Sequence, residues 1–248
     1  MSKNVAAIIC AAGAGTRFGG KRKKPFVDIA GRAVFLRSVE LFANRSDVKQ
    51  ILLAIPEDEQ ELVNVKWGAN LKFFNVSIYI GGEERFDTVR KGLELVKDNI
   101  DIVAIHDACR CCVTEEIIDA CIEAAIDSGA AIPACPVTAT IKKVNEEDKM
   151  IFGTLDRTGL YEAQTPQVFA VKMIKKAYDN IKNLDKVTIS DDAQLVEAIG
   201  LKVSIVETDF SNIKITRPSD IPIAEAIIKS RPKKIPEGPA GPYIEAQW

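Results

Sequence analysis

A glycine-rich loop followed by basic side chains is the clearest chemical feature of this sequence. The apolar run 5–11 leads into Gly13-Ala14-Gly15, and then come Arg17 and four consecutive basic residues, 21–24. Glycines let backbone N–H groups approach and surround an anion. Fixed cations stabilise the charge that builds on a phosphate under attack. The pattern predicts a nucleotide phosphate site in which Arg17 and one of these lysines hold the reacting phosphorus.

Two familiar phosphate loops do not fit this segment. A dinucleotide fingerprint needs a third glycine where Phe18 stands, and a Walker A loop needs Ser or Thr where Arg22 stands. A plain tight turn is the remaining alternative to an anion site.

The sequence offers few residues for histidine-based catalysis or for a cysteine metal site. His106 is the only histidine, and next to Asp107 it is expected to be a structural hydrogen-bonding group. The six cysteines match no zinc spacing and are expected to be free thiols in a reducing compartment.

The net charge of −2 argues against a protein that coats nucleic acid or anionic membrane. With no signal peptide and no apolar segment of about 20 residues, we expect a cytoplasmic protein.

Strand-like and helix-like segments alternate along the chain that must position these residues. Strands are predicted at 5–11, 50–55, 76–80, 102–105, 130–137, 203–206 and 213–216. Helices are predicted at 34–42, 58–67, 84–96, 114–127, 171–181, 191–199 and 220–229, with Thr114 and Ser190 as N-caps. The alternation predicts a Rossmann-like α/β fold, with a mainly parallel sheet and helices on both faces.

Two segments depart from this alternation. Residues 138–160 are predicted to form a β-hairpin arm, with strands at 140–144 and 150–155. Residues 231–248 contain four prolines, which predicts an extended or disordered tail. The prediction is one domain over 1–230, followed by this tail.

Four blocks give the chain a specific resemblance. They are Gly81-Gly82-Glu83-Glu84-Arg85-Phe86-Asp87-Thr88-Val89, His106-Asp107-Ala108-Cys109-Arg110, Ala163-Gln164-Thr165-Pro166-Gln167-Val168-Phe169 and Asn212-Ile213-Lys214-Ile215-Thr216-Arg217-Pro218-Ser219-Asp220. Together with Ala11-Ala12-Gly13-x-Gly15-x-Arg17, they resemble the 2-C-methyl-D-erythritol 4-phosphate cytidylyltransferases of the non-mevalonate isoprenoid pathway. The resemblance covers about 5–229.

The resemblance implies a role for each matching residue. Catalysis falls to Arg17, Lys24 and Lys214. Nucleotide binding is implied for Ala11, Ala12, Gly13, Ala14, Gly15, Gly82, Glu83, Thr88, Asp107 and Ala108. Binding of the acceptor, a polyol phosphate, is implied for Asp107, Arg110, Thr140, Arg157 and Ser190. A homodimer is also implied, in which each arm reaches into the partner subunit's site.

The implied reaction needs no general base, because the acceptor phosphate is already an anion. It attacks the α-phosphorus of CTP, and pyrophosphate leaves with Mg²⁺, which is bound mainly through the nucleotide phosphates.

Several alternatives stay open. The family usually has a lysine followed by glutamine before the aromatic residue; here Lys23-Lys24-Pro25 precedes Phe26, so Lys23 competes with Lys24 for the phosphate role. The acceptor could be ribitol 5-phosphate, and a sugar-1-phosphate nucleotidyltransferase that uses UTP or GTP is a more distant interpretation. An inactive nucleotide-binding regulator is the alternative outside enzymes.

Overall fold

Near-continuous apolar strands form the centre of the molecule. The computed structural model describes residues 3–13, 23–181 and 189–232. Its main sheet has eight strands: β1 Val5–Cys10, β4 Val48–Ile55, β5 Val76–Ile80, β6 Ile102–Asp107, β7 Ala130–Pro136, β10 Tyr161–Ala163, β11 Gln167–Ala170 and β12 Ser204–Glu207. The order is β10-β7-β11-β6-β1-β4-β5, with β12 beside β7. Strands β10 and β11 run antiparallel to their neighbours, and the other pairings are parallel.

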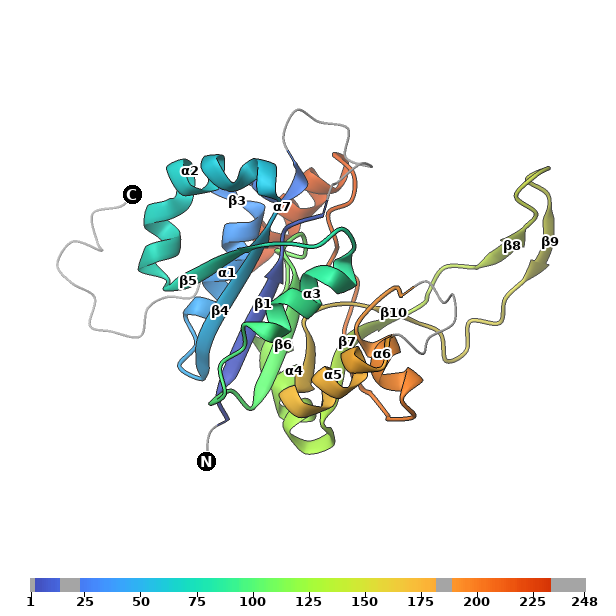
Figure 1. Cartoon of the computed structure of the whole chain (residues 1–248). Coiled ribbons are helices and arrows are strands. Elements are labelled where there is room, and N and C mark those ends of the chain that lie inside the picture. The colour runs from blue at the N-terminus through green and yellow to red at the C-terminus, as the bar shows by residue number, and fades with distance from the viewer. Residues whose placement is uncertain (1–2, 14–22, 182–188, 233–248) are drawn as a thin grey trace.

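Helices cover both faces of this sheet (Figure 1). Side chains alternate along β1, so Ala7 and Ile9 join one core cluster and Ala6 and Ile8 join the other. The first cluster contains α1 Val34–Ala43, α2 Gln60–Phe73 and α4 Glu115–Ser128; the second contains α3 Arg85–Glu94, α5 Val171–Asp179 and α6 Ala193–Ala198. The predicted α/β architecture is confirmed. In the described part of the chain, no helix combines the length and the apolar character that a membrane span needs.

A third, smaller cluster lies beside the carboxyl end of β6. It joins α7 Asp220–Ser230 and the short hairpin of β2 Asp28–Ile29 and β3 Arg32–Ala33 to three buried cysteines, Cys109, Cys111 and Cys112. The described residues also form two short 3-10 helices, η2 Lys24–Phe26 and η3 Glu57–Glu59. All six cysteines lie within the described residues and are free thiols, as predicted.

The predicted arm is a β-hairpin. Strand β8 Lys142–Val144 pairs antiparallel with β9 Ile151–Thr154, and the Val137 N–H donates to the Leu160 carbonyl at the base, with N and O 3.0 Å apart. The hairpin projects well away from the body (Figure 1). Most of the predicted tail, residues 233–248, lies outside the described part of the chain.

Three local predictions were wrong or incomplete. Residues 213–216 do not form a strand; they cross the loop after β6, where the Ile215 N–H donates to the Cys109 carbonyl at 2.9 Å. Ser190 does not cap α6, because its hydroxyl contacts the Gln194 side chain; the Gln194 N–H donates to Asp191 instead. Strand β11 was not predicted, although it lies between β6 and β7.

Candidate functional site

A large cavity lies at the carboxyl ends of parallel strands. In sequence, the chain passes from β1 to β4 and β5 on one side and then returns to β6 on the other side of β1. Ligands of open α/β sheets bind at such a reversal. The cavity holds about 560 Å³, and Cys10 and Asp107, paired neighbours at the ends of β1 and β6, both line it.

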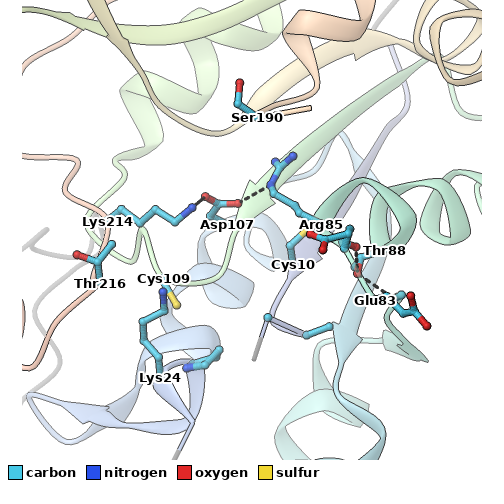
Figure 2. A pocket seen from close by; sticks show the side chains of 15 residues that line it. Cys10, Lys24, Glu83, Arg85, Thr88, Asp107, Cys109, Ser190, Lys214 and Thr216 are labelled. Carbon is cyan, nitrogen blue, oxygen red and sulfur yellow. Dashed lines mark hydrogen bonds and ion pairs between the residues drawn. The ribbon is translucent and has the colours of Figure 1, made fainter. Parts of the chain in front are cut away.

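Asp107 is the electrostatic centre of this cavity. Lys214 and Arg85 approach it from opposite sides (Figure 2), with Nζ 2.5 Å from Oδ2 and Nε 3.1 Å from Oδ1. Burial alone would raise the pKa of Asp107, but the charges of Arg85, Lys214 and Arg110 outweigh it and hold the pKa far below its usual value. The carboxylate is therefore ionised at every physiological pH.

The predicted phosphate side of the cavity is formed by the start of the loop after β1 and by η2. Ala12, Gly13 and Lys24 line it, and Figure 2 shows the Lys24 side chain pointing toward Cys109. Lys23 turns elsewhere, because both carboxylate oxygens of Asp58 hold its Nζ at 2.5 and 2.6 Å. The geometry favours Lys24 over Lys23 as the phosphate ligand.

Three of the predicted phosphate-loop residues cannot be placed. Ala14, Gly15 and Arg17 lie outside the described residues, so their roles stay predictions.

The turn after β5 forms the opposite wall. The Gly82 N–H donates to the Thr88 hydroxyl at 2.9 Å, and that hydroxyl donates to the Glu84 carbonyl at 3.2 Å. A Cβ at Gly82 would lie 2.3 Å from the Asp87 Cβ, so only glycine fits this turn. Gly82, Glu83 and Thr88 all line the cavity.

A second cavity of about 220 Å³ adjoins the first. The two share Arg85, Asp107, Ser190 and Lys214 in their linings. Arg110 lines the smaller cavity, and its guanidinium donates to the Asn212 carbonyl at 2.7 Å. The predicted acceptor residues Arg110 and Ser190 are thus brought next to the predicted nucleotide residues.

Hydrogen bonds between buried side chains of the four resemblance blocks hold the segments of this site in place. The Thr165 hydroxyl accepts from the Asp107 N–H at 3.0 Å and lies 3.0 Å from Nδ1 of His106. The Asn212 amide donates to the Gln164 side chain and to the Thr165 carbonyl, both at 3.0 Å. Burial lowers the pKa of His106 to about 4, so the imidazole is neutral at pH 7. It is a structural group, as predicted.

Four predicted residues do not reach either cavity. Ala11 and Ala108 are buried in the core, and the main-chain groups of Ala108 bond to Cys10 and Ser38. Thr140 and Arg157 are exposed on the arm, where the Arg157 guanidinium donates to the Thr138 carbonyl. Any contact these two make with a ligand needs a partner subunit or a movement of the arm.

Sequence reasoning missed Arg85 and Thr216. Both line the larger cavity, and both belong to blocks that carry the resemblance. An arginine directly after the glycine turn was the available signal for Arg85. Its role could not be predicted from the sequence, because its partners, Asp107 and Asp192, come from distant segments.

A metal site made of protein side chains alone is not found among the described residues, because no three His, Cys, Asp or Glu side chains come together. A divalent ion that arrives on nucleotide phosphates needs no such cluster, since it keeps mostly phosphate and water ligands.

The chain matches one protein family over almost its whole described length. The family model described as 2-C-methyl-D-erythritol 4-phosphate cytidylyltransferase matches residues 5–230. A protein of that name from Endomicrobium trichonymphae is 43% identical over 225 residues, which are 91% of this chain and 99% of the relative. Another, from Caldanaerobacter subterraneus subsp. tengcongensis, is 41% identical over 231 residues, with coverage of 91% and 99%.

Solved structures agree with this match. The crystal structure of a 4-diphosphocytidyl-2C-methyl-D-erythritol synthase from Anaerococcus prevotii has a TM-score of 0.78 at 28% identity and covers 92% of this chain and 97% of its own. The 2-C-methyl-D-erythritol 4-phosphate cytidylyltransferase of Thermus thermophilus has a TM-score of 0.75 at 29% identity, with coverage of 91% and 99%.

Proposed function

The chain belongs to the 2-C-methyl-D-erythritol 4-phosphate cytidylyltransferase family, and we propose that its cavity transfers the cytidylyl group of CTP to 2-C-methyl-D-erythritol 4-phosphate in the non-mevalonate pathway. The observation that carries the assignment is the convergence of Lys24, Lys214 and the glycine turn at 81–82 on one cavity beside the acceptor residues.

The reaction is an in-line displacement at the α-phosphorus. A phosphate oxygen of the acceptor forms a bond to that phosphorus, the bond to the β-phosphate oxygen breaks, and pyrophosphate leaves with the electron pair. The acceptor phosphate is an anion at neutral pH, so no side chain has to remove a proton. A neutral, fully buried His106 is consistent with that requirement.

Each side of the site has its own task. Lys24 and Lys214 hold the phosphates and stabilise the charge that develops on the pentavalent phosphorus, together with Arg17 from the preceding loop. Main-chain groups at Gly82 and Glu83 read the cytosine edge. Arg110 and Ser190 orient the polyol in the smaller cavity.

Mg²⁺ is the proposed cofactor, carried by the CTP phosphates rather than by a protein cage. When bound, it neutralises phosphate charge and stabilises the pyrophosphate that leaves. Lys24 and Lys214 would orient the nucleotide phosphates from the protein side.

A homodimer with exchanged arms is the proposed assembly. The arm exposes a group of large apolar side chains that the body of the same chain does not cover: Val144, Met150, Ile151, Phe152, Leu155 and Leu160. Such surfaces mark protein interfaces. In the partner subunit's site, Thr140 and Arg157 would then reach the acceptor phosphate.

Subunit mixing tests this assembly. We expect Arg157→Ala to raise the acceptor KM about tenfold, because one phosphate contact is lost, while the KM for CTP stays unchanged. Mixing it with an inactive Lys214→Met protein is expected to restore part of the activity, since one of the two sites in each mixed dimer then combines an intact body with an intact arm. A monomeric active protein would contradict the arm exchange.

The proposed location is the cytoplasm, where thiols stay reduced, in keeping with six free cysteines.

The activity itself is tested by pyrophosphate release from CTP with 2-C-methyl-D-erythritol 4-phosphate as acceptor. Ribitol 5-phosphate, and UTP or GTP in place of CTP, serve as the comparison substrates. We expect kcat/KM to be highest for the named pair. Faster release with ribitol 5-phosphate would reassign the acceptor, and no release with any pair would refute the enzymatic function.

A further inference from the structure

Arg85 forms ion pairs with two aspartates that come from different segments of the chain, Asp107 and Asp192. Arg85 begins α3, directly after the glycine turn. Its Nε lies 3.1 Å from Oδ1 of Asp107 at the end of β6, and its Nη1 lies 2.8 Å from Oδ2 of Asp192, just before α6. A planar guanidinium can hold two carboxylates at once in fixed directions, which an ammonium group cannot.

The Asp192 end of this bridge is rigidly held. Its side chain is 1% exposed, and Oδ1 accepts from the Tyr178 hydroxyl at 2.5 Å. The Asp192 N–H donates to the Gln167 side chain at 2.9 Å. Burial would lower the pKa of Arg85, but Asp192 and Asp107 raise it well above its usual value, so the bridge is always charged. Asp192 therefore serves as a fixed anchor for Arg85.

The Asp107 end lies between the two cavities. Arg85 and Asp107 line both of them, and Lys214 contacts the other oxygen of the same carboxylate. Figure 2 shows the order Lys214, Asp107, Arg85 across this wall. The two cations are held differently. Lys214 has a flexible side chain and forms an ion pair with Asp107, whereas the Arg85 guanidinium forms ion pairs with both Asp107 and Asp192.

We propose that Arg85 is a positioning residue for the cytidylyl transfer. Arg85 is anchored on Asp192 and holds the Asp107 carboxylate in place on the wall between the nucleotide and acceptor cavities. Lys214 can then move from Asp107 to the nucleotide phosphates while the Asp107 carboxylate keeps its position. This inference rests on the proposed function. Arg85 acts through Asp107, since its Nε and Nη1 are both held by carboxylates of the protein, Asp107 and Asp192.

The test is a set of variants assayed with CTP and 2-C-methyl-D-erythritol 4-phosphate. Arg85→Gln alone leaves Asp192 buried without its ion pair, which costs stability; a second variant therefore carries Arg85→Gln with Asp192→Asn. Arg90→Gln is the matched control, because Arg90 is exposed on the same helix and pairs with Asp87 at 2.6 Å, whereas the ion pairs of Arg85 are with Asp107 and Asp192. Thermal unfolding of each protein shows that it is folded.

We expect the Arg85→Gln/Asp192→Asn protein to lose at least about tenfold in kcat, with the CTP KM changed less than about threefold. Arg85→Lys is expected to recover part of the loss, and Arg90→Gln to match the wild type. The decisive readout is additivity: in an Asp107→Asn background, removing Arg85 and Asp192 should cost less than about threefold more, because the group they position is already gone.

Three results would overturn the inference. They are unchanged kcat in the double variant, losses that multiply fully in the Asp107→Asn background, or a rise in CTP KM as large as the fall in kcat. The last would make Arg85 a direct nucleotide ligand. These results differ from failure of the proposed function, in which the wild type itself releases no pyrophosphate.

Discussion

Lys24 and Lys23 offer a sharp test of the proposed chemistry, because they are adjacent and identical in type but differ in direction. Lys24 lines the cavity, whereas Asp58 holds Lys23 at 2.5 and 2.6 Å. Replacing each in turn by methionine removes the charge and keeps most of the apolar stem. Lys24→Met is expected to slow turnover strongly, and Lys23→Met is the control.

The size of the effect follows from what Lys24 supplies. It is a fixed cation in a cavity lined with protein, aimed at a phosphate that gains charge during the reaction. Removing one such group costs roughly 3 kcal/mol of transition-state stabilisation. Since about 1.4 kcal/mol is tenfold in rate, kcat should fall about 10²-fold. Lys23 is not among the described residues that line the cavity, and its ammonium group is held by Asp58, so its loss should change kcat less than about twofold.

Steady-state pyrophosphate release gives kcat and KM, and calorimetry gives the CTP affinity separately. We expect Lys24→Met to weaken CTP binding by less than about tenfold, because ground-state phosphates carry less charge at the site of attack. Equal losses in the two variants would refute the assignment. So would a Lys23→Met protein slower than Lys24→Met, which would reverse the two roles.

Three further predictions follow from the structure. Gly82→Ala should raise the CTP KM at least about tenfold, because its Cβ would meet Asp87 at 2.3 Å, whereas Gly68→Ala in α2, with open space around it, should leave KM unchanged. The free energy of unfolding should be highest above pH 6.5 and should fall by about 3 kcal/mol as the pH drops toward 4. The reason is that burial lowers the pKa of folded His106 to about 4, so that only the unfolded protein binds a proton at this residue over that range. Urea unfolding should show a smaller pH-dependent loss for His106→Gln, and an equal loss would contradict this origin. Removing residues 233–248 should leave activity and unfolding temperature unchanged in the same assays, because the cut leaves Arg231 and its contact with the Cys112 carbonyl in place; lower activity or stability would show that the tail contributes.

The helices and strands of the body could be predicted because their signals are local. Alternating burial along a strand and the 3.6-residue repeat of a helix depend on near neighbours in the chain. Strand β5 was predicted with its observed bounds, and the Thr114 cap was correct, since its side chain accepts from the Ile117 N–H. The loop after β1 was predicted to be a phosphate site from its glycine and cation spacing, and because residues 14–22 lie outside the described residues, this stays a prediction.

Strand β11 and the segment 213–216 show where that reasoning fails. The β11 residues were noticed as a motif, but their pairing with β6 and β7 joins residues more than 35 positions apart. Residues 213–216 have a strand-like apolar pattern, yet they cross the loop after β6 and join no sheet. An apolar run shows that a segment is buried and does not identify its neighbour.

The sequence by itself determined the fold class, the family and the residue types available at the nucleotide site. Only the tertiary structure decided which of two lysines faces the cavity, that Ala108 is buried in the core, and that Arg85 ties Asp107 to Asp192. The physical reason is the range of the interactions. Backbone geometry and periodicity act between neighbours in the chain, whereas the partner of a charged side chain depends on which distant segments the packed core brings within about 4 Å.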